Sequence, residues 1–339
     1  MNEQRQWVNN AIALIKADYQ RSADTHLIKL GLSEYPDIDI YLKDESTHPT
    51  GSLKHRLARS LFLYALCNGN INQHTTIVEA SSGSTAISEA YFARLLGLKF
   101  IAVMAKCTSH EKISLIKRYG GQCYLVESTE LIYAESERLA QELNGYYMDQ
   151  FTYAERATDW RGNNNIAESI FEQMSLELHS TPTYIVVSAG TGGTSATIGR
   201  YIRYHQLNTQ LVVTDPEHSV FYDYFKSKDK SLCCTKAGRI EGIGRPRVEP
   251  SFIATLIDNM IKVPDIESVN AMLWLETQLG YKVGPSTGTN MVGVLKLASD
   301  MQAKGEKGAI VTLLCDRGGR YLDSYYCPEW VKLHITETS

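Results

Sequence analysis

The chain has 339 residues, of which 43% are hydrophobic and 21% charged, proportions typical of a globular protein with room for two domains. Its net charge of −4 argues against nucleic acid or an anionic membrane as a partner. The longest apolar stretches, such as residues 100–105, are far shorter than the roughly 20 residues of a membrane span. The first residues lack the basic-then-apolar order of a signal peptide, so we expect a cytoplasmic protein.

The 7 cysteines are scattered along the chain and include no Cys-x-x-Cys pair. We interpret them as reduced, partly buried thiols. No histidine lies at ligand spacing from the adjacent residues Cys233 and Cys234, so the sequence predicts no metal site.

Hydrophobic periodicity predicts alternating strands and helices in the first half of the chain. An amphipathic helix is expected over 3–17, followed by a polar lead-in over 26–32. The expected strands are 38–42, 75–80, 100–105 and 122–127, and the expected helices are 55–67, 86–96, 110–119 and 131–143. This repeat at short intervals predicts a parallel sheet with crossover helices.

The second half continues the pattern after a polar run at 159–165. Residues 219–240 lack clear periodicity and predict a surface excursion. The expected strands are 184–188, 211–214, 261–263 and 309–314, and the expected helices are 166–178, 195–204, 268–279 and a part of one over 294–301.

The segment 43–56, with the sequence KDESTHPTGSLKHR, joins a predicted strand to a helix. Gly51 is typical of a turn, and Ser52 is a candidate N-cap, which places Lys54 in the first helical turn. Amide dipoles there disfavour a positive charge and favour the neutral amine that a nucleophilic lysine needs. On this segment alone, a surface lysine at a helix start is an equal alternative.

A glycine-rich stretch, AGTGGT at 189–194, lies between a predicted strand and a helix. Amides of such a turn point into one concavity, and the positive helix start adds to it, which suits a dianionic phosphate. The spacing fits neither the nucleotide motif G-x-x-x-x-G-K-[S/T] nor the three-glycine dinucleotide fingerprint. A purely structural turn is the alternative.

Two further junctions carry short hydroxyl side chains. The stretch SSGST at 81–85 follows a strand, where hydroxyls and first-turn amides are suited to a carboxylate; an N-capping loop is the alternative. The stretch GPSTG at 284–288 contains Ser286, which is either a functional hydroxyl or a residue of a plain turn.

Taken in order, these motifs resemble those of the pyridoxal 5'-phosphate (PLP) enzymes of the cysteine synthase and cystathionine beta-synthase type. The resemblance covers nearly the whole chain. It implies PLP as the cofactor and the α/β fold of fold type II, similar to tryptophan synthase beta, with parallel sheets flanked by helices. It also implies a large PLP-binding domain of residues 1–50 and 155–339 and a smaller substrate-clamping domain of residues 51–154.

The resemblance implies a role for each motif. Lys54 holds the cofactor covalently, and Ser286 meets the pyridine nitrogen. A neutral hydroxyl there leaves the ring a weaker electron sink than a carboxylate would, which suits loss of a β-substituent. Ser84 stands where the family usually has asparagine and is expected to keep a hydrogen bond to the cofactor. The implied phosphate ligands are Gly190, Thr191, Gly192, Gly193 and Thr194, and the implied substrate-binding residues are Ser81, Ser82, Gly83, Thr85, Gln150 and Gly242.

Four charged residues near these motifs leave alternatives open. Arg245 and Arg247, with Glu249, are interpreted either as tuning the substrate pocket or as solvated loop charges. Asp316 is interpreted either as a pocket carboxylate or as a residue that pairs with a neighbouring helix or loop.

Three longer stretches most resemble the bacterial L-cysteine desulfhydrase branch of this family. They are residues 43–56, MDQFTYAERATDWRGNNN at 148–165 and GIGRPRVEPS at 242–251. The resemblance implies a homodimer that converts L-cysteine into hydrogen sulfide, pyruvate and ammonia. The chemistry of the residues does not separate lyase from synthase, so β-replacement by a cysteine synthase or cystathionine-forming enzyme is the alternative. Retention of Lys54 with the phosphate loop argues against a catalytically silent relative that only binds an amino acid or a protein.

Overall fold

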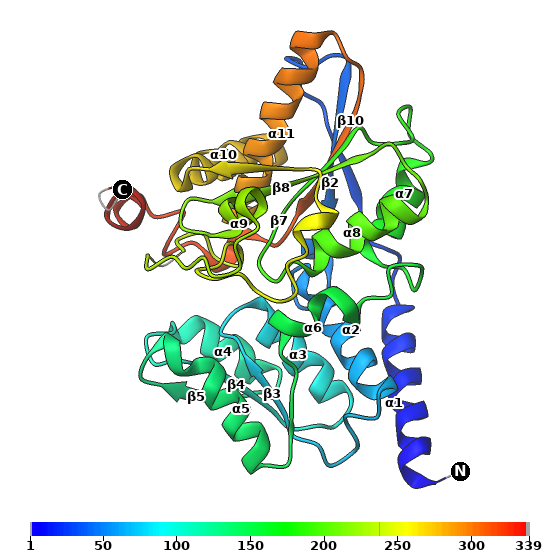
Figure 1. Ribbon diagram of the computed structural model, residues 1–339, viewed down its shortest axis with the longest axis vertical. Helices are drawn as coiled ribbons and strands as arrows, with labels where there is room; N and C mark the ends of the chain where they lie inside the picture. The colour runs from blue at the N-terminus through cyan, green and yellow to red at the C-terminus, as the bar shows by residue number, and fades with distance from the viewer. Residues whose placement is uncertain (1, 237, 337–339) are drawn as a thin grey trace. The chain divides into compact units, whose positions relative to one another are not determined.

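The computed structural model describes residues 2–236 and 238–336, which divide into two compact units (Figure 1). Unit 1 runs up to Asp24 and then from His48 to Thr158, and unit 2 comprises Thr25–Thr47 and the chain from Asp159 onward. The sequence places residues 1–50 in the large domain, whereas the structure places the first 24 in the smaller unit. The reason is that the first helix buries Ala11 and Ile15 in the core of unit 1.

Unit 1 is built on a four-stranded sheet of order β5-β4-β3-β6, in which every strand pair is parallel. Its strands are β3 (Ile77–Ala80), β4 (Phe100–Ala105), β5 (Gln122–Val126) and β6 (Tyr146–Tyr147). Its helices are α1 (Glu3–Tyr19), α2 (Lys54–Cys67), α3 (Ser84–Leu95), α4 (His110–Arg118), α5 (Ile132–Glu142) and α6 (Gln150–Ala157). Aliphatic and aromatic side chains of α1, α2 and α3 pack with β3 and β4 into one apolar core.

Unit 2 is built on a six-stranded sheet of order β1-β2-β10-β7-β8-β9, parallel except for the edge pair β1 and β2. Its strands are β1 (Leu27–Leu30), β2 (Ile38–Asp44), β7 (Tyr184–Ser188), β8 (Gln210–Pro216), β9 (Asn259–Val263) and β10 (Gly308–Leu314). Its helices are α7 (Ile166–Met174), α8 (Gly193–Tyr204), α9 (Phe221–Ser227), α10 (Asp265–Leu279), α11 (Pro285–Lys304) and α12 (Pro328–Val331). Parallel strands joined by helices are what the alternating sequence pattern predicts.

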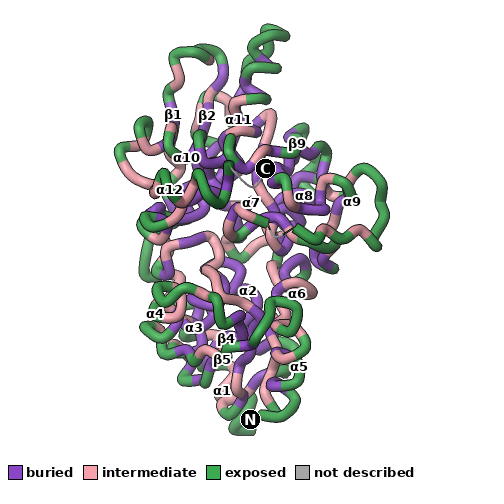
Figure 2. The backbone as a smooth tube through the Cα atoms, turned by 90° about the vertical axis from the view of Figure 1, so that its left-hand side faces the viewer, coloured by how far each residue is buried: buried purple, intermediate pink, exposed green. Residues whose placement is uncertain are grey.

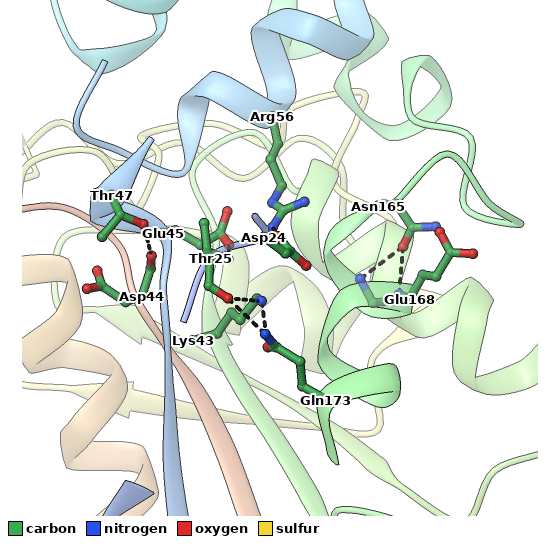
Figure 3. A network of polar contacts seen from close by, with 11 residues as sticks. Asp24, Thr25, Lys43, Asp44, Glu45, Thr47, Arg56, Asn165, Glu168 and Gln173 are labelled. Atoms are coloured by element: carbon green, nitrogen blue, oxygen red, sulfur yellow. Dashed lines mark hydrogen bonds and ion pairs between the residues drawn. The ribbon is translucent and has the colours of Figure 1, made fainter. Parts of the chain in front are cut away.

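Buried polar side chains fix the start of unit 2 (Figure 3). Lys43, near the end of β2, is fully buried, and its Nζ donates to the carbonyl oxygen of Thr25 at 2.7 Å and to Gln173 Oε1 at 2.6 Å. Asn165 caps α7, since its Oδ1 accepts from the amide of Ala167 at 2.9 Å and from the amide of Glu168 at 3.1 Å. The bonds of Lys43 therefore anchor the end of β2, after which the chain runs on to Lys54, and the bonds of Asn165 fix the start of α7.

Three elements differ from the sequence expectations. The predicted polar lead-in at 26–32 contains the edge strand β1, whose backbone bonds to β2 outweigh its weak apolar pattern. The stretch 284–288, for which a plain turn is the alternative, is instead the N-cap and first turn of α11. Residues 226–231 are exposed as predicted (Figure 2), but residues 221–227 form α9, whose Phe221 is fully buried with its ring stacked on Phe252 at a centroid distance of 3.9 Å.

Because Phe221 is fully buried against Phe252, Phe221→Ala is expected to lower the free energy of unfolding by about 3–5 kcal/mol. The matched control is Phe225→Ala on the same helix, whose ring is only half-buried and whose loss is expected to cost about 1 kcal/mol. Urea unfolding of both variants measures the difference. Equal losses would show that α9 contributes surface and not core.

Candidate active site

The part of the segment 43–56 that belongs to unit 1, residues 48–56, ends in the first turn of α2, as the sequence predicts. Lys54 is the first helical residue, and its side chain is half-buried. The N-cap position is Leu53 and not Ser52, but the Ser52 hydroxyl still accepts from the Lys54 amide at 3.3 Å. Gly51 has a φ of +75°, a conformation that a side chain disfavours, so glycine is the residue suited to the turn before Lys54.

The turn that leads to Lys54 is tied to α3. Thr50 Oγ1 lies 2.8 Å from Ser88 Oγ and 3.1 Å from His55 Nδ1, and all three residues are buried. The His55 ring also packs on the Phe92 ring at a centroid distance of 4.8 Å. These contacts hold the backbone before Lys54 in one position relative to α3.

The predicted carboxylate loop, Ser81 to Thr85, leads from β3 into α3. Ser81 Oγ accepts from the Gly83 amide at 3.2 Å, which folds the loop into a tight turn. Gly83 is the N-cap of α3 and offers no side chain to its first amides. An uncapped helix start of this kind is suited to an anionic group.

Gln150 lies next to this loop within unit 1. The Thr85 hydroxyl donates to Gln150 Oε1 at 2.8 Å, and both residues are buried. The Oε1 atom is thereby occupied, while the carboxamide nitrogen bonds to none of the described residues. The structure therefore brings together the loop and the glutamine that the sequence assigns separately to carboxylate binding.

Two buried glutamates that the sequence analysis does not single out lie behind these elements. Glu79 in β3 accepts from the amide of Ala80 at 2.7 Å through Oε1 and from the amide of Gln150 at 3.2 Å through Oε2. Glu89, on α3, is fully buried. Burial raises the pKa of both carboxyl groups, and the neighbouring charge of Glu79 raises that of Glu89 further. The sequence signal for them is a glutamate inside an apolar strand and another among small residues of a helix.

The glycine-rich loop of unit 2 leads from β7 into α8. Gly192 is the N-cap with a φ of +86° and provides no side-chain cap for the first amides of α8. A Cβ on Gly190 would lie 2.4 Å from the carbonyl oxygen of Gly242, and one on Gly192 would lie 2.8 Å from that of Ser251. The glycines thus let the loop pack closely against 242–252, and the first amides of α8 remain suited to a phosphate.

The segment 242–251 beside this loop is internally braced. Glu249 is fully buried and pairs with Arg245 Nε at 2.9 Å and with Arg247 Nε at 3.2 Å. Gly242 and Gly244 both adopt positive φ angles, +86° and +68°. The arginines are therefore partners of a buried carboxylate and not merely solvated loop charges.

Ser286 lies in the first turn of α11, after Pro285, and is buried. Its hydroxyl makes no hydrogen bond to any of the residues that the structure describes. The helix start is fixed to the end of β10, since the Gly284 amide donates to the carbonyl oxygen of Asp316 at 3.1 Å. Asp316 also accepts from the Tyr321 hydroxyl at 2.7 Å, which favours the pairing interpretation of this carboxylate.

These donor sets fit PLP. An amine lies at a helix start, and the start of α8, where Thr191 Oγ1 accepts from the Gly193 amide and the N-cap Gly192 has no side chain, suits the phosphate. A neutral hydroxyl without a partner among the described residues suits the pyridine nitrogen. Unit 1 carries Lys54, the 81–85 loop and Gln150, and unit 2 carries the glycine loop, Gly242 and Ser286. No helix in the described part of the chain has both the length and the apolar character needed to cross a membrane.

Two α/β units with these loops define a PLP-dependent enzyme of fold type II. Residues 20–316 match the family model described as pyridoxal-phosphate dependent enzyme, so the chain belongs to this family and its cofactor is PLP. The family, fold class and cofactor predicted from the sequence are confirmed.

The chain is similar to several characterised proteins. It is 59% identical over 331 residues to L-cysteine desulfhydrase Cds1 of Mycobacterium tuberculosis, which covers 96% of this chain and 90% of that protein. The crystal structure of O-ureido-L-serine synthase aligns with a TM-score of 0.79 and 24% identity over 93% of this chain and 94% of its own. The O-acetylserine dependent cystathionine beta-synthase from Helicobacter pylori aligns with a TM-score of 0.76 and 27% identity, over 92% and 97%.

The buried glutamate pair predicts how stability depends on pH. The pKa of Glu89 is raised in the folded chain. At pH values above the ordinary pKa of a glutamate, the unfolded chain therefore releases a proton that the folded chain retains. Stability therefore falls as pH rises above that value, by up to about 1.4 kcal/mol per pH unit for one group. Glu89→Gln removes this loss, so its thermal midpoint is expected to exceed that of the wild type increasingly from pH 5 to pH 9.

The control for that measurement is Glu137→Gln, at an exposed position of α5, which is expected to follow the wild-type pH profile. Parallel profiles for Glu89→Gln and the wild type would contradict the raised pKa of Glu89.

Proposed function

We propose that this chain is an L-cysteine desulfhydrase, a PLP-dependent carbon–sulfur lyase that converts L-cysteine into hydrogen sulfide, pyruvate and ammonia. The observation that carries the proposal is the 59% identity, over 96% of the chain, to a protein named for this activity. The desulfhydrase function predicted from the sequence is supported by the same match.

When bound, PLP withdraws electrons from the substrate Cα and so makes its proton removable. In the proposed mechanism, Lys54 holds the cofactor before substrate arrives, and its Nζ then takes the proton from Cα. The start of α2 suits this role, because first-turn amides disfavour a positive charge on Nζ and keep the amine basic and neutral.

The cofactor is proposed to be held at both ends by unit 2. The amides and hydroxyls of Gly190 to Thr194 bind the phosphate, and Ser286 meets the pyridine nitrogen. Because Ser286 is neutral, it does not hold the ring protonated, and the cofactor favours loss of the β-substituent over reactions that need a long-lived carbanion. Ser84 is proposed to donate a hydrogen bond to the cofactor from the start of α3.

The substrate carboxylate is proposed to bind to the first amides of α3, including the amide of Thr85, and to the hydroxyls of Ser81 and Ser82, with Gly83 allowing close approach. Gln150 contributes its carboxamide nitrogen, because its oxygen is already bound by Thr85. Gly242 is proposed to contact the substrate from the braced segment 242–251.

The test is to give the PLP-loaded protein L-cysteine and to quantify sulfide and pyruvate together. The proposed lyase is expected to release both in equal amounts. Sulfide without pyruvate would instead indicate that another nucleophile captures the carbon skeleton, as in a β-replacement enzyme, and would contradict the proposal.

Lys54→Ala is the matched inactive variant in that assay. We expect it to lose at least a thousandfold in rate while its thermal midpoint changes little, because a catalytic base and the covalent link are lost together. Lys106→Ala, at an exposed lysine, is the control and is expected to retain wild-type turnover. Normal turnover in Lys54→Ala would refute the assignment of this residue.

We also infer a cytoplasmic homodimer, an inference that rests on the family resemblance of the sequence motifs. Light scattering of the purified protein is expected to give about twice the chain mass of 38.0 kDa. A mass equal to one chain would overturn the dimer.

A further inference from the structure

One buried carboxylate connects the two carboxylate-binding elements of unit 1. Glu79 Oε1 accepts from the Ala80 amide, immediately before the 81–85 loop, and Oε2 accepts from the Gln150 amide, at the first residue of α6. Both amides donate to different oxygens of one carboxyl group, an arrangement suited to the ionised form. The positive start of α6 further favours a negative charge at this position.

A second bond also joins the 81–85 loop to Gln150. The Thr85 hydroxyl, at the end of the loop, donates to Gln150 Oε1 at 2.8 Å. The backbone from Ala80 to Thr85, the Gln150 side chain and the Glu79 carboxylate therefore form a closed ring of bonds. A change in either tie alters the distance between the loop and the Gln150 carboxamide.

Glu89 is the neutral neighbour of this ring. It is fully buried, and no N–H or O–H group of the other described residues donates to its carboxyl oxygens, while the carboxyl group of Glu79 lies within hydrogen-bonding reach of it. A buried carboxyl group without a donor keeps its proton, whereas Glu79 has two backbone donors that favour its charge. The other titratable groups that act on the pair are Asp149, beside α6, and Tyr147 on β6.

We propose that Glu79 is a positioning residue for substrate binding, whose carboxylate sets the spacing between the 81–85 loop and Gln150 so that both reach one substrate carboxylate. This inference rests on the proposed function, because it assumes that these two elements bind the carboxylate. Glu79 itself is fully buried, so it acts through the amides of Ala80 and Gln150, which donate hydrogen bonds to it.

Glu79→Gln tests the proposal with little change of shape. A carboxamide has one acceptor oxygen, so one of the two amides would face an NH₂ group and lose its partner. The affinity of the PLP-loaded protein for glycine, followed by the visible absorption of the cofactor, is expected to fall about tenfold. Glycine carries the carboxylate but no β-substituent, so it binds without elimination. In turnover of L-cysteine, KM should rise by a similar factor, with kcat within about threefold of the wild type.

Methylamine is the probe that separates positioning from general damage, because it has the amine and lacks the carboxylate. Its affinity is expected to be the same in Glu79→Gln and the wild type. Glu89→Gln is the matched control, since a neutral amide replaces a neutral acid of the same shape, and its affinity for glycine should stay within twofold. Equal weakening of glycine and methylamine, or no weakening of glycine, would overturn the proposal.

If Glu79→Gln does not fold, Thr85→Val breaks the ring at its other tie and leaves Glu79 intact. It is expected to show the same selective loss of glycine affinity, and an unchanged affinity would overturn the proposal. A wild-type protein that binds glycine but releases no sulfide from L-cysteine would refute the proposed lyase activity while leaving the role of Glu79 to be decided by the variants.

Discussion

The amides of Ala80 and Gln150 donate hydrogen bonds to the two carboxyl oxygens of Glu79, and these bonds fix the two elements of unit 1 that are proposed to bind the substrate carboxylate. They join the end of β3 to the start of α6, two points separated by 70 residues of sequence (Ala80 and Gln150). In the proposed function, the 81–85 loop and Gln150 bind one substrate carboxylate together, and these bonds would fix the distance between them. A charged group inside an apolar unit is costly, and these backbone donors offset that cost.

In unit 2, the backbone amides of the glycine-rich loop at 189–194 are the proposed phosphate ligands. Glycines at 190 and 192 permit close packing against the segment 242–252, and the buried Glu249 holds that segment through Arg245 and Arg247. Gly192 has no side chain that could cap α8, and the Thr191 hydroxyl accepts from the Gly193 amide at 3.3 Å, which leaves the next amides of the first turn open to a ligand. In the proposed function, the neutral hydroxyl of Ser286 completes the set of groups that would hold the cofactor without protonating its ring.

The sequence predicts the strands and motifs well because the signals are local. Strands β4 and β7 have the predicted bounds, since each is a short apolar run between turn residues. The position of Lys54 follows from the turn and the helix pattern around it. These features need no knowledge of distant contacts.

The parts that the sequence does not predict depend on long-range packing. The start of α9 is buried only because Phe221 stacks on Phe252, 31 residues away in the sequence. The pairing of Thr85 with Gln150 and the tie from Glu79 bring together residues about 65 to 71 positions apart. A glutamate in an apolar strand signals an unusual site, but its partner appears only when the sheet is assembled.

Lys54 is proposed to carry the cofactor, and borohydride reduction of the PLP-loaded protein tests this role most directly. Reduction makes the lysine–cofactor link permanent, so peptide mapping by mass spectrometry then identifies the modified residue. We expect a pyridoxyl group on the peptide that contains Lys54. A modification on another lysine, or none in a protein that retains bound PLP, would contradict it.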